Sequence, residues 1–338
     1  MHLRPATDFA KPHGFFKPKC RTHRVPRFRC RTCGRTFSRQ TFRADYRDHK
    51  PDRNQIVIIL LCSGIGLRQT ARVALMSRQG LAKKFRKIGR HLRQLNRNLR
   101  GPLPDDAVLQ FDELETYEAR RNSRPLTLPI LIERPSRCIL GMRSAPIRPS
   151  GTITPNRDRA IQADEARWGR RPSRSRAAVH SVLRRGAKLC EKLPRVRLET
   201  DEKSTYPTLA ARAFGRERLE HECTSSKVAR DTRNPLFPIN HTEAMARDLN
   251  GRLRRESWLV IKRRWFLNLQ LEIYAAFRNF VRPRFNGERK TPAQWVGWVD
   301  APLSPNQLMA WRQDWGPRSG HPSSDSASPI HPTPSATA

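Results

Sequence analysis

Acidic residues are scarce in this sequence. Its 338 residues include 30 Asp plus Glu against 67 Lys plus Arg, which gives a formal net charge of +37. Such an excess makes the folded chain repel itself, so it indicates a polyanionic partner, and nucleic acid is the commonest one. Arg outnumbers Lys, which suits bidentate contacts to phosphate groups. The alternative is a generally Arg-rich composition with no dedicated partner.

The sequence also lacks a cysteine framework and a long apolar run. Its seven Cys are an odd number and only Cys30 and Cys33 are closely spaced, which excludes a disulfide scaffold and indicates a reducing compartment. The longest apolar stretch, 56–67, is shorter than the roughly 20 residues that cross a bilayer. Residues 1–5 lack the apolar core of a secretory signal. We therefore expect a cytoplasmic, nucleoid-associated protein without a membrane partner.

Composition divides the chain into four regions, 1–50, 51–100, 101–300 and 301–338. The first is basic and contains three cysteines, the second has helical periodicity, and the third mixes strand and helix patterns. The last is expected to be a small cap followed, from 317, by a disordered Pro- and Ser-rich tail. In the third region we expect strands at 107–112, 126–133, 138–144, 195–200 and 219–224. Helices are expected at 156–190, with a break at 171–173, and at 242–281, with room for one break. This order predicts the α/β class, a mixed sheet covered by helices.

Cys30 and Cys33 form half of a zinc-binding motif. Two thiolates separated by two residues can wrap one tetrahedral ion, and Gly34 lets the chain turn back beneath it. A closed Zn²⁺ site needs four ligands, and the candidates for the other two are Cys20, His13 and His23. The alternative is a pair of reduced cysteines in a basic loop.

Residues 51–100 predict three helices, at 55–63, 67–74 and from a cap at Ser77 to about residue 99. The third helix is strongly basic and contains Arg78, Lys83, Lys84, Arg86, Lys87 and Arg90. A three-helix unit whose last helix is this basic fits a helix-turn-helix lying in the major groove of double-stranded DNA. The alternative is a solvated basic face on an ordinary helical hairpin.

Isolated carboxylates near strand ends are informative in so basic a chain. Asp112 follows Leu109 and Phe111, whose side chains are expected to face the core, so strand alternation turns Asp112 the other way. Asp201 has the same relation to the core residues of 195–200, and the two aspartates could lie side by side on one sheet. The alternative for each is a turn or capping aspartate. Their neighbours Glu113, Glu115 and Glu202 are weaker candidates, because alternation turns Glu113 and Glu115 towards the core.

Glu243 is expected to open the helix at 242–281. Arg247, Asn250 and Arg254 follow it on one helical face, at i+4, i+7 and i+11. A carboxylate and cations on one face suit a metal ion that touches a DNA backbone. Phosphodiester chemistry commonly uses two divalent ions about 4 Å apart, and Mg²⁺ or Mn²⁺ binds carboxylate oxygens. The alternative for Glu243 is a surface ion pair with Arg247.

Six short stretches carry a resemblance to a known family. They are 13–17 (HGFFK), 27–38 (RFRCRTCGRTFS), 66–72 (GLRQTAR), 111–116 (FDELET), 199–201 (ETD) and 240–243 (NHTE). In this order they resemble bacterial insertion-sequence transposases of the DDE class, over residues 13–285. The resemblance implies a zinc ribbon at 1–50, a helix-turn-helix at 51–100 and a ribonuclease H-like catalytic domain at 101–300. It also implies that Asp112, Asp201 and Glu243 bind the metal ions.

The resemblance further implies the activity and the partners. A homo-oligomer would bind the terminal repeats of the element, nick the DNA with activated water, and join the freed 3′-hydroxyl to target DNA. The chain departs from the family in three ways. The first cysteine pair of the ribbon is missing. Leu75 stands where a turn glycine is usual, and a left-handed conformation there costs roughly 1–2 kcal/mol of stability. Gly80 lies inside the third helix, where it costs roughly 1 kcal/mol relative to alanine.

Two alternative functions remain from the sequence. One is a defective or domesticated transposase that binds DNA without cutting it, which the departures from the family favour. The other is a basic protein that associates with RNA or the ribosome, which the net charge alone suggests.

Overall fold

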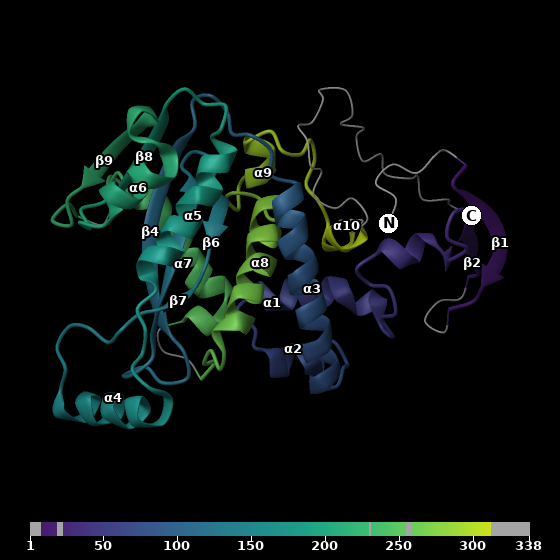
Figure 1. Cartoon of the computed structure of the whole chain (residues 1–338), viewed down its shortest axis with the longest axis horizontal. Coiled ribbons are helices and arrows are strands. Elements are labelled where there is room, and N and C mark those ends of the chain that lie inside the picture. Colours follow the sequence, from purple (N-terminus) through teal and green to yellow (C-terminus); the bar gives the residue numbers. More distant parts are fainter. Residues whose placement is uncertain (1–7, 19–22, 230, 255–257, 312–338) are drawn as a thin grey trace.

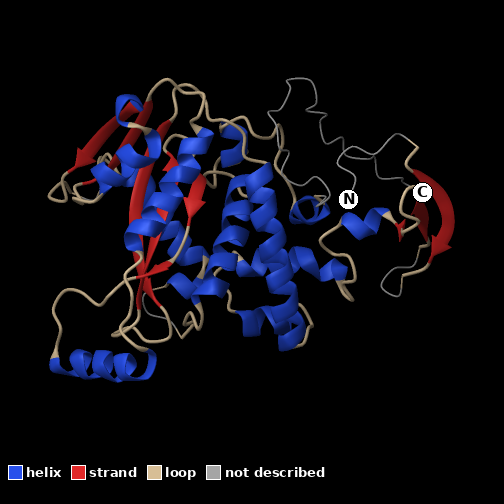
Figure 2. Cartoon of the chain, in the orientation of Figure 1, coloured by secondary structure: helices blue, strands red, loops and turns tan. Residues whose placement is uncertain are grey.

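The computed structural model describes residues 8–18, 23–229, 231–254 and 258–311. It is a mixed α/β structure with a small antiparallel sheet near the N-terminus and a six-stranded mixed sheet flanked by helices (Figures 1 and 2). The predicted α/β class is therefore confirmed. None of the helices in the described ranges is long and apolar enough to cross a membrane. The predicted disordered tail at 317–338 lies outside the described residues.

The N-terminal sheet is formed by β1 (Ala10–Phe16), β2 (Val25–Cys30) and β3 (Thr36–Phe37). Both of its strand pairs are antiparallel. The Phe37 ring stacks on Phe9 and Phe28, with centroid distances of 5.8 and 5.9 Å, so aromatic contacts hold this small sheet together. Two 3₁₀ turns follow, at Arg39–Phe42 and Pro51–Arg53.

Three helices follow where the sequence predicts them: α1 (Asn54–Leu61), α2 (Leu67–Val73) and α3 (Arg78–Asn98). Ser77 caps α3 as expected, because its Oγ accepts a hydrogen bond of 3.0 Å from the Gly80 amide. The turn between α2 and α3 places Leu75 at a φ of 50°. This left-handed conformation, expected from the missing glycine, is unfavourable for a residue with a Cβ atom.

The large sheet has the strand order β6-β5-β4-β8-β9, and β7 also pairs with β5. β4 pairs antiparallel with β5 and parallel with β8, and β9 continues the parallel part. The strands are β4 (Val108–Tyr117), β5 (Pro125–Glu133), β6 (Cys138–Met142), β7 (Ala145–Pro146), β8 (Val196–Asp201) and β9 (Leu219–Thr224). β4 therefore extends five residues beyond Asp112, which lies inside the strand and not at its end. The reason is that β5 pairs with β4 as far as Tyr117, whereas β8 ends earlier.

Helices cover both faces of the large sheet. α5 (Ser175–Leu189) and α6 (Tyr206–Phe214) pack on one face, in a core that includes Phe111, Val182 and Leu198. α7 (Phe237–Leu249) and α8 (Arg264–Phe280) pack on the other, in a core that includes Leu114, Ile239 and Tyr274. α4 (Pro155–Trp168) stands apart from the sheet at the lower left of Figure 1. The short helices α9 (Pro292–Trp295) and α10 (Pro305–Ala310) complete the described chain.

α8 joins the first helices to the sheet. Its Leu267, Leu271 and Tyr274 face the sheet core, whereas Leu269 and Ile273 belong to a core shared with α1, α2, α3 and α10. Figure 1 shows α8 between the large sheet and α3. The first three helices and the large sheet therefore both pack against α8.

The helix expected at 242–281 has the one break that the sequence left open, but its expected start is wrong. α7 begins earlier, at Phe237, and ends at Leu249; a 3₁₀ turn, η4 (Gly251–Leu253), follows, and α8 begins at Arg264. The break brings the backbone against the turn after α1, where the Gly64 amide donates a 2.8 Å hydrogen bond to the Leu249 carbonyl. A Cβ atom on Gly251 would lie 2.3 Å from the Gly64 oxygen, so only glycine fits at this close approach.

Candidate functional site

Asp112 and Asp201 lie on neighbouring parallel strands. The pairing of β4 with β8 ends at Gln110 and Glu199, and the same register continued by two residues brings Asp112 opposite Asp201. Because side chains alternate along a strand, both aspartates share the face that carries Gln110 and Glu199. This is the face covered by α7, since the Ile239 amide of α7 donates a 2.9 Å hydrogen bond to Gln110 Oε1. The predicted juxtaposition of the two strands is thus present in the fold.

Both aspartates are partly exposed and hydrogen-bonded to nearby backbone. Asp112 Oδ1 accepts a hydrogen bond of 2.6 Å from the Glu113 amide. Asp201 Oδ1 accepts one of 3.1 Å from the Lys203 amide. Burial, followed by the charges of Glu113, Asp112 and Asp201, raises the pKa of Tyr206, so both aspartates act electrostatically on one hydroxyl.

Glu243 lies in the middle of α7 and does not open it, which corrects the expected position of the helix start. α7 runs beside β4: its Ile239 amide contacts Gln110, and Arg247 Nη1 donates to the Glu115 carbonyl at 3.3 Å. Glu243 is four residues from each of these contacts. With rises of about 1.5 Å per helical residue and 3.3 Å per strand residue, it lies roughly level with Asp112.

The three acidic side chains do not form a closed metal site. No group of three or more His, Cys, Asp or Glu side chains is placed to hold a metal ion anywhere in the described ranges. This applies equally to the cysteines of the N-terminal sheet. Cys30 is buried at the end of β2, Cys33 is exposed in the next turn, and Cys20 lies outside the described residues. Gly34 has the expected positive φ, 68°. The pKa of Cys30 is lowered from its ordinary value, mainly by a hydrogen bond from the Cys33 amide.

Glu113 forms a buried hub that sequence reasoning underrated. Its carboxylate accepts hydrogen bonds from Thr127 Oγ1 at 2.6 Å, Ser175 Oγ at 2.8 Å and Tyr206 Oη at 3.0 Å, and it pairs with Lys203 Nζ. Burial alone would raise the pKa of Glu113, but the hydrogen bonds from Lys203 and Thr127, with the Lys203 charge, hold it below its usual range. Its alternation with Asp112 predicts the inward direction, but nothing in the sequence predicts the four partners.

Gln110 and Glu199 are a second pair that the sequence did not single out. Gln110 Nε2 donates to Glu199 Oε2 at 2.6 Å and to the Pro235 carbonyl at 2.7 Å. Glu199 also pairs with Arg134 Nη1 at 2.5 Å. These residues precede Asp112 and Asp201 by two positions, so alternation from the aspartates was the signal that could have found them. They connect β4, β8 and the start of α7 directly below the aspartates.

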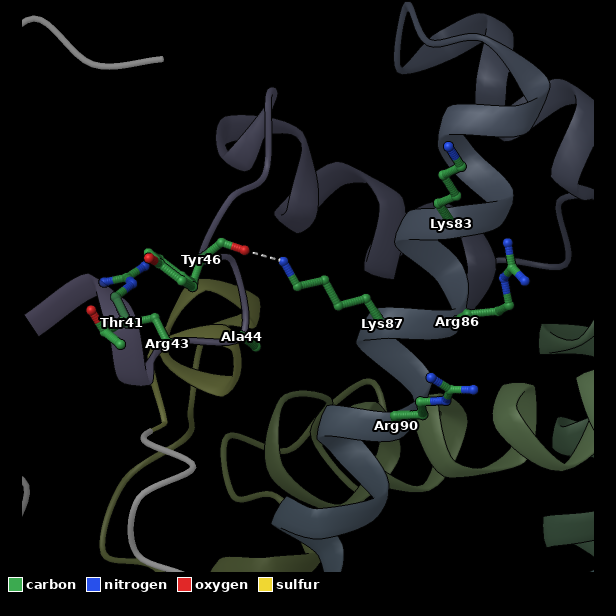
Figure 3. A pocket seen from close by; sticks show the side chains of 8 residues that line it. All are labelled: Thr41, Arg43, Ala44, Tyr46, Lys83, Arg86, Lys87 and Arg90. Atoms are coloured by element: carbon green, nitrogen blue, oxygen red, sulfur yellow. Dashed lines mark hydrogen bonds between the residues drawn. The ribbon is translucent and has the colours of Figure 1, made fainter. Parts of the chain in front are cut away.

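The basic helix α3 divides into buried and accessible cations. Lys84 has a side chain only 5% exposed, pairs with Asp48 Oδ2 at 3.0 Å and donates to Asn54 Oδ1 at 2.5 Å. It is therefore a core lysine, and its predicted role in DNA binding is wrong. Lys87 is partly exposed but already engaged within the protein, because it pairs with Asp48 Oδ1 at 2.9 Å and donates to the Tyr46 carbonyl (Figure 3).

Four cations of α3 line a hollow. Its volume is about 550 Å³, and it is bounded by Lys83, Arg86, Lys87 and Arg90 on one side and by Thr41, Arg43, Ala44 and Tyr46 on the other (Figure 3). Lys83, Arg86 and Arg90 form no ion pair with any described residue. Together with Arg78, they are the cations of this helix that fit a DNA-contacting role.

The residues expected to follow Glu243 on one helical face, Arg247, Asn250 and Arg254, are arranged differently in the structure. Asn250 is only 1% exposed; it follows the end of α7 and hydrogen-bonds to the Ala246 carbonyl and to Gln270. Arg254 lies beyond η4 and pairs with Asp248 at 3.6 Å. The break after Leu249 therefore removes both residues from the face of Glu243, and only Arg247 keeps the predicted spacing.

Comparisons with known proteins add little to this geometry. No known protein family matches the sequence, and no curated protein matches it. Among solved structures, a crystal structure of a pre-cleavage Mos1 transpososome matches at 11% sequence identity, over 62% of this chain and 72% of that chain, with a TM-score of 0.17. Similarity at this level does not establish a shared fold.

Proposed function

We propose that this protein is a transposase that cuts and joins DNA, with Asp112, Asp201 and Glu243 as ligands of Mg²⁺ or Mn²⁺. The observation that carries the proposal is the parallel register of β4 and β8, which pairs Gln110 with Glu199; the same register continued by two residues would set Asp112 opposite Asp201. The ribonuclease H-like class of the domain is part of the same proposal. The net charge of +37 supports DNA as the substrate. That the bound DNA includes the terminal repeats of an insertion sequence is part of the same proposal.

The acidic residues fit a hard divalent ion. Mg²⁺ prefers carboxylate oxygens and retains several waters, so its ligands must be reachable from solvent. Asp112, Asp201 and Glu243 are all partly exposed, which meets this requirement. To bind the ion, Asp112 and Asp201 would turn away from the Glu113 and Lys203 amides, which the present side chains contact. Each carboxylate would thus exchange a local hydrogen bond for a stronger charge interaction.

The protein residues would hold and orient the reacting groups. A bound divalent ion activates water for attack on phosphorus and stabilises the departing oxygen. Asp112 and Asp201 would hold that ion from two rigid strands, and Glu243 would approach from α7. Lys203 links the two sides, because its amide contacts Asp201 and its ammonium group pairs with Glu113. The cations of α3, Arg78, Lys83, Arg86 and Arg90, would neutralise DNA phosphates.

The test is metal-dependent nicking of duplex DNA that carries the sequences flanking the gene. We expect the wild-type protein to nick this DNA with Mn²⁺ or Mg²⁺, and Asp112→Asn and Asp201→Asn to fall to the metal-free background. Asp248→Asn is the matched control, because Asp248 lies on α7 with its side chain 70% exposed. Equal activity in wild type and Asp112→Asn would refute this catalytic site.

A DNA-binding protein that no longer cuts is the second candidate. One observation favours it: the described residues offer no assembled group of three metal ligands. This candidate predicts salt-sensitive binding to the element's ends without any metal-dependent product. It also predicts that the electron paramagnetic resonance signal of Mn²⁺ stays that of the free ion when protein is added. A transposase should instead reduce the free-ion signal, and Asp112→Asn and Asp201→Asn should reduce it less than wild type does.

A further inference from the structure

A cationic hollow of about 370 Å³ lies at the start of α7. It is bounded by the turn between β5 and β6, by the segment before α7 and by the loop after α8. The lining residues are Arg134, Pro135, Arg137, Thr232, Asn234, Pro235, Phe237, Pro238, Arg284 and Phe285. None of these described lining residues is acidic, so the hollow favours an anion.

Arg137 is the cation of this hollow without an acidic partner. Arg134 pairs with Glu199, and Arg284 pairs with Glu288, each at 2.5 Å. Arg137 forms no ion pair with the described residues, and its Nη1 is buried without a hydrogen-bond partner. Its guanidinium lies between two aromatic rings, 5.8 Å from the Phe237 centroid and 5.7 Å from that of Phe285.

The surroundings of Arg137 are unfavourable for a cation in the ligand-free protein. Burial, followed by the charges of Arg284, Arg278 and Arg134, lowers the pKa of Arg137 to about 10. The side chain still carries its charge at neutral pH. Its backbone has a φ of 62°, a conformation that residues with a Cβ atom rarely adopt and that is common at functional sites. A bound anion would offset the repulsion and use the unpaired N–H group.

The aromatic wall of the hollow suits a nucleobase. Phe237 and Phe285 each lie 5.9 Å from the His241 ring, and the Phe285 side chain is partly exposed. Unstacked bases of single strands bind on such aromatic groups, and the phosphates bind to nearby Arg. A free inorganic anion would need the Arg side chains but not the aromatic wall.

The hollow is connected to the paired aspartates. Arg134 pairs with Glu199, and Gln110 bonds to both Glu199 and the Pro235 carbonyl. Gln110 and Glu199 precede Asp112 and Asp201 by two residues, which is about 7 Å along a strand. A strand held in the hollow would therefore lead directly to the acidic face.

We propose that the Arg137 hollow binds a phosphate group of a single DNA strand, with an unstacked base against Phe237 or Phe285. This inference deepens the proposed function, because it assigns a binding site to the strand that Asp112 and Asp201 would cut. It concerns binding alone and can be tested without metal ions.

The test compares Arg137→Gln with Arg216→Gln, which removes an equal charge from an exposed 3₁₀ turn. Binding of a short labelled single-stranded oligonucleotide is measured by fluorescence anisotropy in EDTA at several salt concentrations. Loss of one charge-assisted hydrogen bond should weaken binding by Arg137→Gln about tenfold. The slope of log affinity against log salt should fall by about 0.7. Arg216→Gln should stay within about twofold of wild type.

Thermal unfolding separates binding from a structural role. Without ligand, Arg137→Gln should unfold close to the wild-type temperature, because the loss of the cation–π contacts with Phe237 and Phe285 opposes the relief of like-charge repulsion. Unfolding far below the wild-type temperature, which would make Arg137 a structural residue, or oligonucleotide affinity equal to wild type, would overturn the proposal. Stabilisation of wild type by inorganic phosphate with unchanged oligonucleotide affinity in Arg137→Gln would also overturn it, in favour of a free-anion site. Because binding is measured in EDTA, a failure of metal-dependent cutting leaves this result interpretable.

Discussion

Substitution of Glu113 tests whether the buried carboxylate holds the sheet and the turn after β8 together. Its side chain is 4% exposed and accepts four hydrogen bonds. Glutamine can keep the shape: its carbonyl can accept from Lys203 and Tyr206, and its amino group can donate to the Thr127 and Ser175 hydroxyls. The change then replaces charge-assisted hydrogen bonds with neutral ones, and half-exposed Lys203 is partly screened, so we expect a loss of about 1–2 kcal/mol in the free energy of unfolding.

Alanine should be considerably worse at the same position. It leaves three partly buried hydroxyl groups and an ammonium group without their acceptor, and it opens a cavity between β4 and α5. Breaking a buried ion pair by removing one partner costs about 3–5 kcal/mol. The predicted order of stability is therefore wild type, then Glu113→Gln, then Glu113→Ala.

The pH dependence provides the decisive measurement. The pKa of Glu113 is lowered in the folded protein, so the folded state binds this proton more weakly than the unfolded chain does. Its contribution is complete above the ordinary glutamate pKa and is lost as the pH falls through the folded pKa. Urea unfolding followed by tryptophan fluorescence should show a difference in the free energy of unfolding between wild type and Glu113→Gln at pH 7. This difference should become smaller in acid. A gap that is independent of pH, or an alanine variant as stable as the glutamine variant, would refute the assignment.

Two further predictions concern α3. Lys84→Met should lower the free energy of unfolding by about 3 kcal/mol, because it removes the buried cation that Asp48 and Asn54 share and leaves Asp48 paired with Lys87 alone. It should leave DNA affinity within about twofold in filter binding. If Lys84→Met were as stable as wild type but bound DNA much more weakly, Lys84 would contact DNA after all. Gly89→Ala should destabilise by about 1 kcal/mol, because its Cβ would lie 2.8 Å from Leu269 Cβ, whereas Gly80→Ala in the same helix should stabilise by up to about 1 kcal/mol. Equal shifts of the two thermal midpoints would contradict the close packing of α3 on α8.

The sequence predicted those features of the fold that local pattern controls. All five strands of the large sheet that were expected are present, and the break near 171–173 separates α4 from α5. Alternation from Leu109 and Phe111 placed Asp112 away from the α5 side. The left-handed turn at Leu75 was expected from the family resemblance, because a glycine is usual at that position. Period and turn chemistry carry this information in a few neighbouring residues.

Long-range contacts account for what the sequence could not predict. The sequence shows Lys84 as one more cation of a basic helix, but in the fold it is enclosed by Asp48 and Asn54, which lie 36 and 30 residues away. The break between α7 and α8 follows from the contact of Gly251 with Gly64, which no helical period reveals. The same contact explains why Asn250 and Arg254 do not lie on the helical face of Glu243, where the sequence predicted them. The surroundings of Arg137 could not be predicted from the turn after β5, because its aromatic neighbours, Phe237 and Phe285, lie more than 90 positions away in the sequence.

The buried helix α8 determines how the two basic surfaces are arranged relative to the acidic face. Its Leu269 lies against Gly89 of α3, and its Leu271 belongs to the core under β4 and β5. Because close-packed interiors transmit displacement and do not absorb it, α3 cannot shift along α8 without disturbing the sheet that carries Asp112. DNA bound on α3 and a strand bound near Arg137 would thus be held in one fixed relation to the aspartates. An enzyme that must cut at a set distance from its recognition sequence requires such a relation, whereas a simple DNA-binding protein does not.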